Sequence, residues 1–301
     1  MFESVRKNKF ESGIIVAIFI VVITLIVYYI CHALNLGTMS IVIALIFSIA
    51  SAWGSYYYSD KIVLSVNKAR PATKEEDLKL VNILDALMVT SGLPVKPRLY
   101  VVEDAQPNAF ATGRNPQNAV ICVTTGLLEK LDYYELEGVI AHEMSHIKNY
   151  DIRLSCIVSV MVGFIVMISD MFSRALFWGG IRDNDSDSDS DNRGNAILMV
   201  IGLVFLILSP IFGSLMQLAL SRKREFLADS TAVEFTRNPE GLISALEKLE
   251  NDPNELEYAN SATANMYIVN PFKKNGKKKT TSIWSTHPST ADRIEALRNL
   301  R

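Results

Sequence analysis

Residues 13–59 read GIIVAIFIVVITLIVYYICHALNLGTMSIVIALIFSIASAWGSYYYS, a run that contains no Asp, Glu, Lys or Arg. A helix needs ~20 mostly apolar residues to cross the hydrocarbon core of a bilayer. Gly13–Ile30 and Met39–Tyr57 approach or reach that length, and the link CHALNLGT between them is short and uncharged. The sequence therefore predicts a transmembrane hairpin, and not a cleaved signal peptide, because a second span follows the first at once.

Two further uncharged stretches extend this prediction. They are Leu154–Ser169 and Ala196–Leu220, of which the shorter would also suit a buried soluble helix. We expect four transmembrane helices in two hairpins. They divide the chain into a first hairpin (1–59), a first polar part (60–152), a second hairpin with an acidic outer loop (153–220) and a second polar part (221–301).

Basic residues indicate the orientation. They precede the first span and follow the second and fourth, at Arg6, Lys7, Lys9, Lys61, Lys68, Arg70, Arg222, Lys223 and Arg224. Lys and Arg near span ends favour the cytoplasmic side. We expect a multi-pass protein of the cell membrane whose termini and two polar parts face the cytoplasm.

Overall composition excludes several classes of protein. Thirty basic and thirty-two acidic residues give a net charge of −2, which argues against a nucleic-acid binder. Three cysteines without CxxC spacing exclude a disulfide scaffold and a thiolate zinc site. The Asp/Ser repeat at 183–191 fits no EF-hand register, which argues against a calcium site there. The Lys-rich stretch at 273–279 lacks the interleaved aromatic residues of a nucleic-acid-binding patch. Both segments are therefore expected to be solvated.

The segment 60–152 is typical of a small mixed α+β domain. Apolar spacing predicts a helix over Thr73–Thr90 that SGLP ends, and β-branched runs predict strands at Arg98–Glu103 and Ala119–Thr124, with a short strand at 110–112. A second helix is expected to begin after Asp132, because Glu135 three residues later completes a capping-box pattern.

That second helix contains VIAHEMSHIKN at 139–149. His142 and His146 are four residues apart, so both imidazoles project from one helix face and can reach one metal ion. Glu143 lies beside that face, where it can act on the attacking water instead of binding the ion. The HExxH pattern therefore favours a metal-dependent hydrolase over two histidines on a polar helix face.

Two histidines leave a catalytic zinc short of its third protein ligand. In ALSRKREFLADSTAVEF at 219–235, Glu225 and Asp229 share a helix face. Glu225 could complete a His₂Glu site, and Asp229 could accept a hydrogen bond from a ligand histidine. By spacing alone, an acidic pair of this kind is more often a solvated face.

Several motifs together resemble the HtpX-type membrane zinc metalloproteases, bacterial relatives of the CAAX prenyl endopeptidases. HEMSH is followed by a long apolar interval, SRKREFLAD at 221–229 and THPSTADRI at 286–294, while PNAFATG at 107–113 and the first hairpin precede it. The resemblance covers essentially the whole chain. It implies a mainly α membrane protein with a small α+β, zincin-like catalytic domain.

The resemblance also implies the chemistry. One Zn²⁺ per chain would be bound by His142, His146 and Glu225, with Glu143 as general base and Asp229 as a partner of a ligand. It implies a zinc metalloendopeptidase that acts in quality control of misfolded or damaged membrane proteins. The expected partners are unfolded or membrane-protein substrates and the lipid bilayer, and the oligomeric state is open.

Two residues near residue 290 are weaker candidates. The resemblance implies that His287 lies near the site, so it is expected to stabilise the transition state, although a histidine that fixes a turn is an equal alternative. Arg293 could pair with a ligand carboxylate, but a surface salt bridge is the expectation.

Substrate is expected to add as a strand to an exposed sheet edge, because main-chain hydrogen bonds tolerate varied sequences. The expected edge comprises Asn108, Ala109, Phe110, Ala111 and Thr112, and the alternative is a buried strand whose Phe110 fills the core.

Two other functions compete with the metalloendopeptidase. One is an intramembrane metalloprotease, which the charges around HEMSH disfavour. The other is a membrane scaffold or transporter subunit, which the lack of ionisable residues in the spans disfavours.

Overall fold

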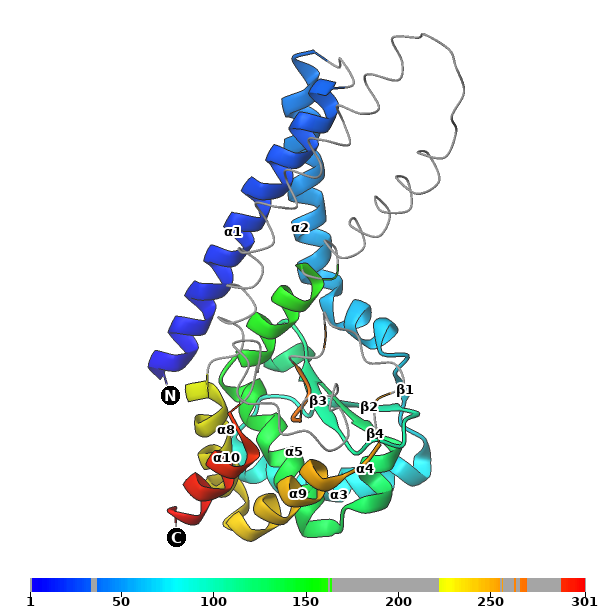
Figure 1. The fold of residues 1–301 in the computed structure, drawn as a ribbon, viewed down its shortest axis with the longest axis vertical. Coiled ribbons are helices and arrows are strands. Elements are labelled where there is room, and N and C mark those ends of the chain that lie inside the picture. The colour runs from blue at the N-terminus through cyan, green and yellow to red at the C-terminus, as the bar shows by residue number, and fades with distance from the viewer. Residues whose placement is uncertain are drawn as a thin grey trace.

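The structure is a computed structural model that describes residues 2–33, 37–161, 163, 222–254, 256, 263, 266–269 and 288–300. Two long helices, α1 (Phe2–Ala33) and α2 (Met39–Val66), pack on each other and extend from a mixed body of helices and strands (Figure 1). Among the described residues, two segments are long and apolar enough to cross a membrane, Val5–Tyr28 and Met39–Val66. The predicted hairpin therefore has its counterpart in α1 and α2.

The surfaces of these two helices suit an apolar surrounding. Small residues such as Ala44 are buried between them, and Thr24 and Ser48 hydrogen-bond across the interface with an oxygen–oxygen distance of 2.7 Å. Large apolar side chains such as Ile46 and Trp53 point outward. A soluble hairpin of this length would expose an unusually large apolar surface to water.

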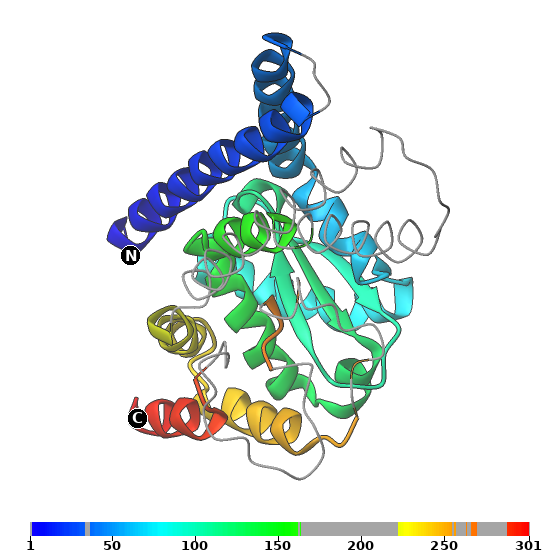
Figure 2. The same ribbon diagram turned by 45° about the horizontal axis from the view of Figure 1, so that its top comes forward.

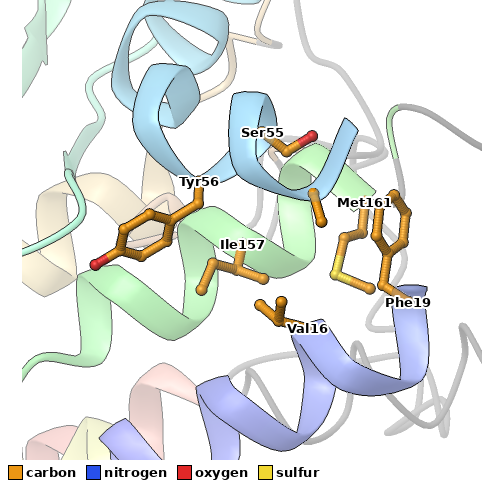
Figure 3. Close-up of a pocket in the computed structure, with 7 residues that line it drawn as sticks. Val16, Phe19, Ser55, Tyr56, Ile157 and Met161 are labelled. Atoms are coloured by element: carbon orange, nitrogen blue, oxygen red, sulfur yellow. The ribbon is translucent and has the colours of Figure 1, made fainter. Parts of the chain in front are cut away.

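The other two predicted spans, 154–169 and 196–220, lie outside the described residues except for 154–161 and 163. Residues 151–161 are helical, and Leu154, Ile157 and Met161 join an apolar cluster with α1. Figure 3 shows a small pocket at this junction, lined by Val16, Phe19, Ala52, Ser55, Tyr56, Ile157 and Met161. The structure thus describes two candidate spans, and the expectation of four remains a prediction.

The mixed body contains a four-stranded sheet. Its strands are β1 (Arg70–Pro71), β2 (Arg98–Val102), β3 (Ala109–Thr112) and β4 (Val120–Thr124), in the order β1-β2-β4-β3. β2 and β4 are parallel, and β1 and β3 are antiparallel to their neighbours. β3 is therefore the outermost strand of the sheet on the side next to β4.

Helix α5 (Tyr133–Lys148) lies between the sheet and a group of later helices (Figure 2). On one side it contacts β3 and β4, and on the other it contacts α8 (Arg222–Thr236) and α9 (Pro239–Asn251), against which α10 (Thr290–Arg298) packs. A Cβ at Gly138 of α5 would lie 2.8 Å from the backbone nitrogen of Leu242. Glycine at this position lets α5 and α9 approach closely, which fixes the depth of α5 in the core.

The expected elements of the segment 60–152 are confirmed. Helix α3 (Lys74–Ser91) starts from the N-cap Thr73 and ends at Gly92, whose φ of 65° is left-handed. The predicted strands appear as β2, β3 and β4, followed by α4 (Thr125–Lys130), and the short 3₁₀ helix η1 (Pro116–Asn118) lies in the turn between β3 and β4. Helix α5 begins at the residue after Asp132, with the capping box to Glu135 formed.

Candidate metal centre

Helix α5 is held rigidly before the HEMSH segment begins. The buried carboxylate of Glu135 accepts hydrogen bonds from Ser244 Oγ and Lys248 Nζ of α9, each at 2.6 Å, while it also closes the capping box. This carboxylate ties the start of α5 to α9. Helix α5 is not among the candidate spans of the described residues.

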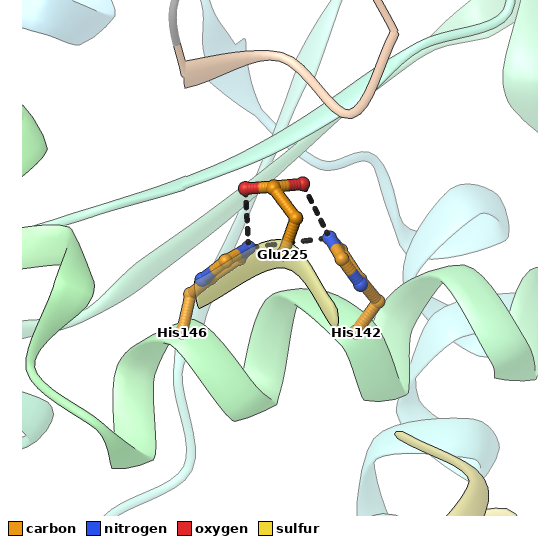
Figure 4. A group of neighbouring side chains, drawn as sticks. All are labelled: His142, His146 and Glu225. Carbon is orange, nitrogen blue, oxygen red and sulfur yellow. Dashed lines mark hydrogen bonds and ion pairs between the residues drawn. The ribbon is translucent and has the colours of Figure 1, made fainter. Parts of the chain in front are cut away.

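Two turns further along α5, the side chains of His142 and His146 converge with Glu225 of α8 (Figure 4). The two Nε2 atoms lie 3.2 Å apart, and the Glu225 carboxylate oxygens lie 3.7 Å from Nε2 of His142 and 3.6 Å from Nε2 of His146. Two nitrogens bound tetrahedrally to zinc at 2.0–2.1 Å would be separated by about 3.3 Å. The donor set therefore fits a single ion of this size.

The opposite nitrogen of each ring faces a carboxylate. Nδ1 of His142 lies 2.9 Å from Asp229 Oδ1, and Nδ1 of His146 lies 2.9 Å from Asp151 Oδ2. An imidazole that donates through Nδ1 presents the lone pair of Nε2, so both rings are oriented as metal ligands. Asp229 thus lies where the sequence placed it, whereas the role of Asp151 was not foreseen.

Arg293 of α10 contacts the centre through Asp229. Its side chain is 2% exposed and donates two hydrogen bonds to Asp229, from Nε at 2.8 Å and from Nη2 at 2.6 Å. Nη1 also donates to the Ile268 carbonyl at 3.2 Å. The expectation of a surface salt bridge was therefore wrong, because α10 packs on α8 and α9 and buries this guanidinium against the carboxylate.

Burial and neighbouring charges set the ionisation of this cluster. Burial lowers the pKa of His142, and the positive charge of Arg293 lowers it further. Burial alone would raise the pKa of Asp229, but the charge and hydrogen bonds of Arg293 hold it below its usual value. Burial disfavours the charged form of His146, yet the hydrogen bond to Asp151 and the charge of Glu225 raise its pKa to about 9. Binding a cation at His146 therefore releases a proton.

Glu143 is buried beside the ligands, where burial raises its pKa to about 7. The backbone N–H of Ala111 in β3 hydrogen-bonds to this carboxylate, an interaction that opposes the shift. A carboxyl group with a pKa near neutrality can both accept and return a proton. This environment is suited to general acid–base work.

The expected substrate strand, Asn108–Thr112, contains β3 and lies at the end of the sheet order, but all its residues are buried. Thr124 N donates to the Asn108 carbonyl, so Asn108 directs its backbone groups toward β4. Because this direction alternates along an antiparallel pair, the N–H and C=O groups of Ala109 and Ala111 point away from β4. The Ala109 carbonyl accepts from Ile268 N at 3.0 Å. Residue 268 thus occupies part of this edge, while Phe110 packs against Tyr267.

Other predicted residues lie outside the described part of the chain. They are His287, the Asp/Ser repeat and the Lys-rich stretch. Conversely, sequence reasoning missed the contact of Asp151 with His146, and it ranked the pairing of Arg293 with a carboxylate below a surface salt bridge. Asp151 follows His146 by five residues and is the first acid after the helix, a signal that could have indicated a partner for the histidine.

Comparisons with known proteins agree on one family. The sequence profile of peptidase family M48 matches residues 74–301. A protein named Protease HtpX homolog from Dictyoglomus thermophilum is 41% identical over 297 residues, which cover 99% of this chain and 94% of the relative. A relative of the same name from Streptococcus gordonii is 40% identical over 308 residues, covering all of both chains. The crystal structure of S. mikatae Ste24p is similar in fold, with a TM-score of 0.52, 18% identity, and coverage of 99% of this chain and 67% of that one.

Proposed function

This chain belongs to peptidase family M48 and is an HtpX-type metallopeptidase, and from that premise we propose that it is a zinc-dependent endopeptidase anchored in the membrane. His142, His146 and Glu225 would hold the ion, and Glu143 would be the general base. The observation that carries the proposal is the convergence of the three donor groups, whose ligand atoms lie within 4.8 Å of one another.

When bound, zinc would lower the pKa of water to ~7 and polarise the scissile carbonyl. The chain's own residues supply the rest of the mechanism. Glu143, with its pKa raised to about 7 by burial, accepts the proton of the attacking water and returns it to the leaving amine. Asp229 and Asp151 keep the two imidazoles in the ligand orientation during this cycle.

The developing oxyanion needs a hydrogen-bond donor. We propose His287 as this donor, and the likeness of THPSTADRI to the family's motif supports the proposal. Arg293 is a weaker one, since its Nε and Nη2 are already engaged by Asp229.

We further propose that the centre works on the cytoplasmic side of the cell membrane on misfolded or damaged membrane proteins. The Lys and Arg residues that flank the candidate spans support this orientation. The outward backbone groups of Ala109 and Ala111 support strand addition at β3, because the N–H of Ala111 contacts Glu143. Binding there would require residue 268 to leave the Ala109 carbonyl.

The test separates metal binding from hydrolysis. Glu143→Gln should retain one zinc per chain and lose casein cleavage in detergent, whereas His142→Ala and Glu225→Ala should lose both. Glu137→Gln makes the same substitution elsewhere on α5 and should change neither. Cleavage by Glu143→Gln at a near wild-type rate would refute the general-base assignment, and zinc retained by both ligand variants would refute the site.

A further inference from the structure

The turn that leaves α5 has an unusual backbone. Tyr150 has a φ of 61°, in the left-handed region that a bulky side chain rarely adopts. This conformation reverses the chain after Asn149, so that Asp151 faces back toward the helix and its Oδ2 reaches His146 Nδ1 at 2.9 Å. The orientation of a proposed zinc ligand therefore depends on a strained turn that needs support from its surroundings.

That support comes from α1. The side-chain amide of Asn8, only 2% exposed, donates to the Asn149 carbonyl at 2.9 Å and to Asp151 Oδ1 at 2.6 Å. Lys9 Nζ lies 4.2 Å from the centre of the Tyr150 ring. Each of the three turn residues is thus contacted by a helix that precedes it by about 140 positions.

The same amide also contacts the helix that carries the third ligand. Arg224, the neighbour of Glu225, places Nη1 3.4 Å from Asn8 Oδ1 and 3.4 Å from Glu11 Oε2, with Nε 3.9 Å from Asp151 Oδ1. The amide nitrogen of Asn8 thus faces acceptors and its oxygen faces a donor, so the orientation of the group is fixed by its partners. Asn8 joins the exit of α5 to the start of α8.

We propose that Asn8 is a positioning residue for the metal centre: it holds Asp151 in the orientation that fixes the ring of His146. The inference rests on the proposed function, because it assumes that His146 binds the ion. Helix α1 then helps to position a metal ligand, and it is also a candidate membrane anchor. A helix that served only for anchoring would need no buried amide at this place.

The expected effect is on metal affinity. Replacing the hydrogen-bond partner of a ligand typically weakens metal binding by about 10–100-fold. Asp151→Asn should fall within that range. Asn8→Ala acts one contact further out, so a loss of about 10-fold, the lower end of the range, is expected. Asn8→Asp should lose more, because it places a second carboxylate against Asp151.

The experiment uses the full chain in detergent. The dissociation constant for Zn²⁺ is measured by competition with a chromophoric chelator, and the visible spectrum of the Co²⁺-substituted protein reports the ligand geometry. Phe10→Ala is the matched control, since Phe10 lies on the same helix with 69% of its surface exposed. Thermal unfolding of each variant identifies any general loss of folding.

A double variant separates positioning from simple packing. If Asn8 acts through Asp151, Asn8→Ala should weaken zinc binding little further in an Asp151→Asn background. Zinc affinity and Co²⁺ spectrum of Asn8→Ala equal to those of Phe10→Ala would overturn the inference, and so would losses that simply multiply in the double variant. If instead the wild type binds no zinc, or His146→Ala binds it equally well, the proposed metal site itself fails.

Discussion

Removing the guanidinium of Arg293 should destabilise the catalytic part of the protein severely. In Arg293→Leu, Asp229 keeps its contact with His142 Nδ1 but loses both hydrogen bonds from the guanidinium, and the Ile268 carbonyl loses a donor. Asp229 is almost fully buried, so water cannot replace what is lost. Breaking a buried ion pair by removing one partner costs about 3–5 kcal/mol.

For the catalytic part, a loss of this size should lower the melting temperature by roughly 6–20 °C, at about 2–4 °C per kcal/mol. The assay is thermal unfolding in detergent, followed by intrinsic fluorescence. Arg298→Leu is the control on the same helix, because its side chain is 59% exposed and its ion pair with Glu247 is worth at most about 1 kcal/mol.

A second substitution tests the cause. Asp229→Asn in the Arg293→Leu background removes the unpaired charge and should recover part of the lost stability, although it leaves His142 without its carboxylate. A melting temperature of Arg293→Leu within 2 °C of the Arg298→Leu value (roughly 1 kcal/mol or less) would refute the reasoning, since the buried pair would then contribute no more than a surface one.

Three further outcomes are expected. A strong chelator should abolish casein cleavage and one equivalent of zinc should restore it, and restoration in His142→Ala would contradict the ligand set. Ala111→Pro removes the N–H that contacts Glu143, so hydrolysis should fall while zinc content stays at one per chain; normal cleavage would exclude any role of this edge. Hydrogen bonds from Arg70 lower the pKa of Glu76 to about 2, so this carboxylate stabilises the fold above pH 4.5 and does so less as the pH falls toward 2. The difference in melting temperature between wild type and Glu76→Gln should therefore shrink as the pH falls over that interval. A constant difference would contradict the assignment.

Local signals in the sequence were sufficient for the elements around the centre. The apolar spacing of the helix after Thr73, the capping box at Asp132 and the spacing of His142 and His146 act within a few turns, so they can be recognised without knowing the fold. Glu225 required the family resemblance, because an acidic residue on a polar helix carries no sign of its distant partners.

The residues that sequence reasoning missed or ranked wrongly depend on tertiary packing. Arg293 becomes buried only because α10 covers α8, and Asp151 reaches His146 only because Tyr150 adopts a positive φ. Neither event follows from periodicity or composition. Asn8 lies among the basic residues that precede the first predicted span, and nothing in that stretch indicates a contact more than 140 residues away in the sequence.

The position of Arg293 also has a consequence for biosynthesis. Arg293 lies 151 residues beyond His142, and at about 5–20 residues per second a ribosome needs roughly 8–30 s to add them. Throughout that interval the helix with the HEMSH segment exists without the guanidinium that secures Asp229. The cluster of His142, Asp229 and Arg293 therefore stays incomplete during that interval, although both histidines have already been made.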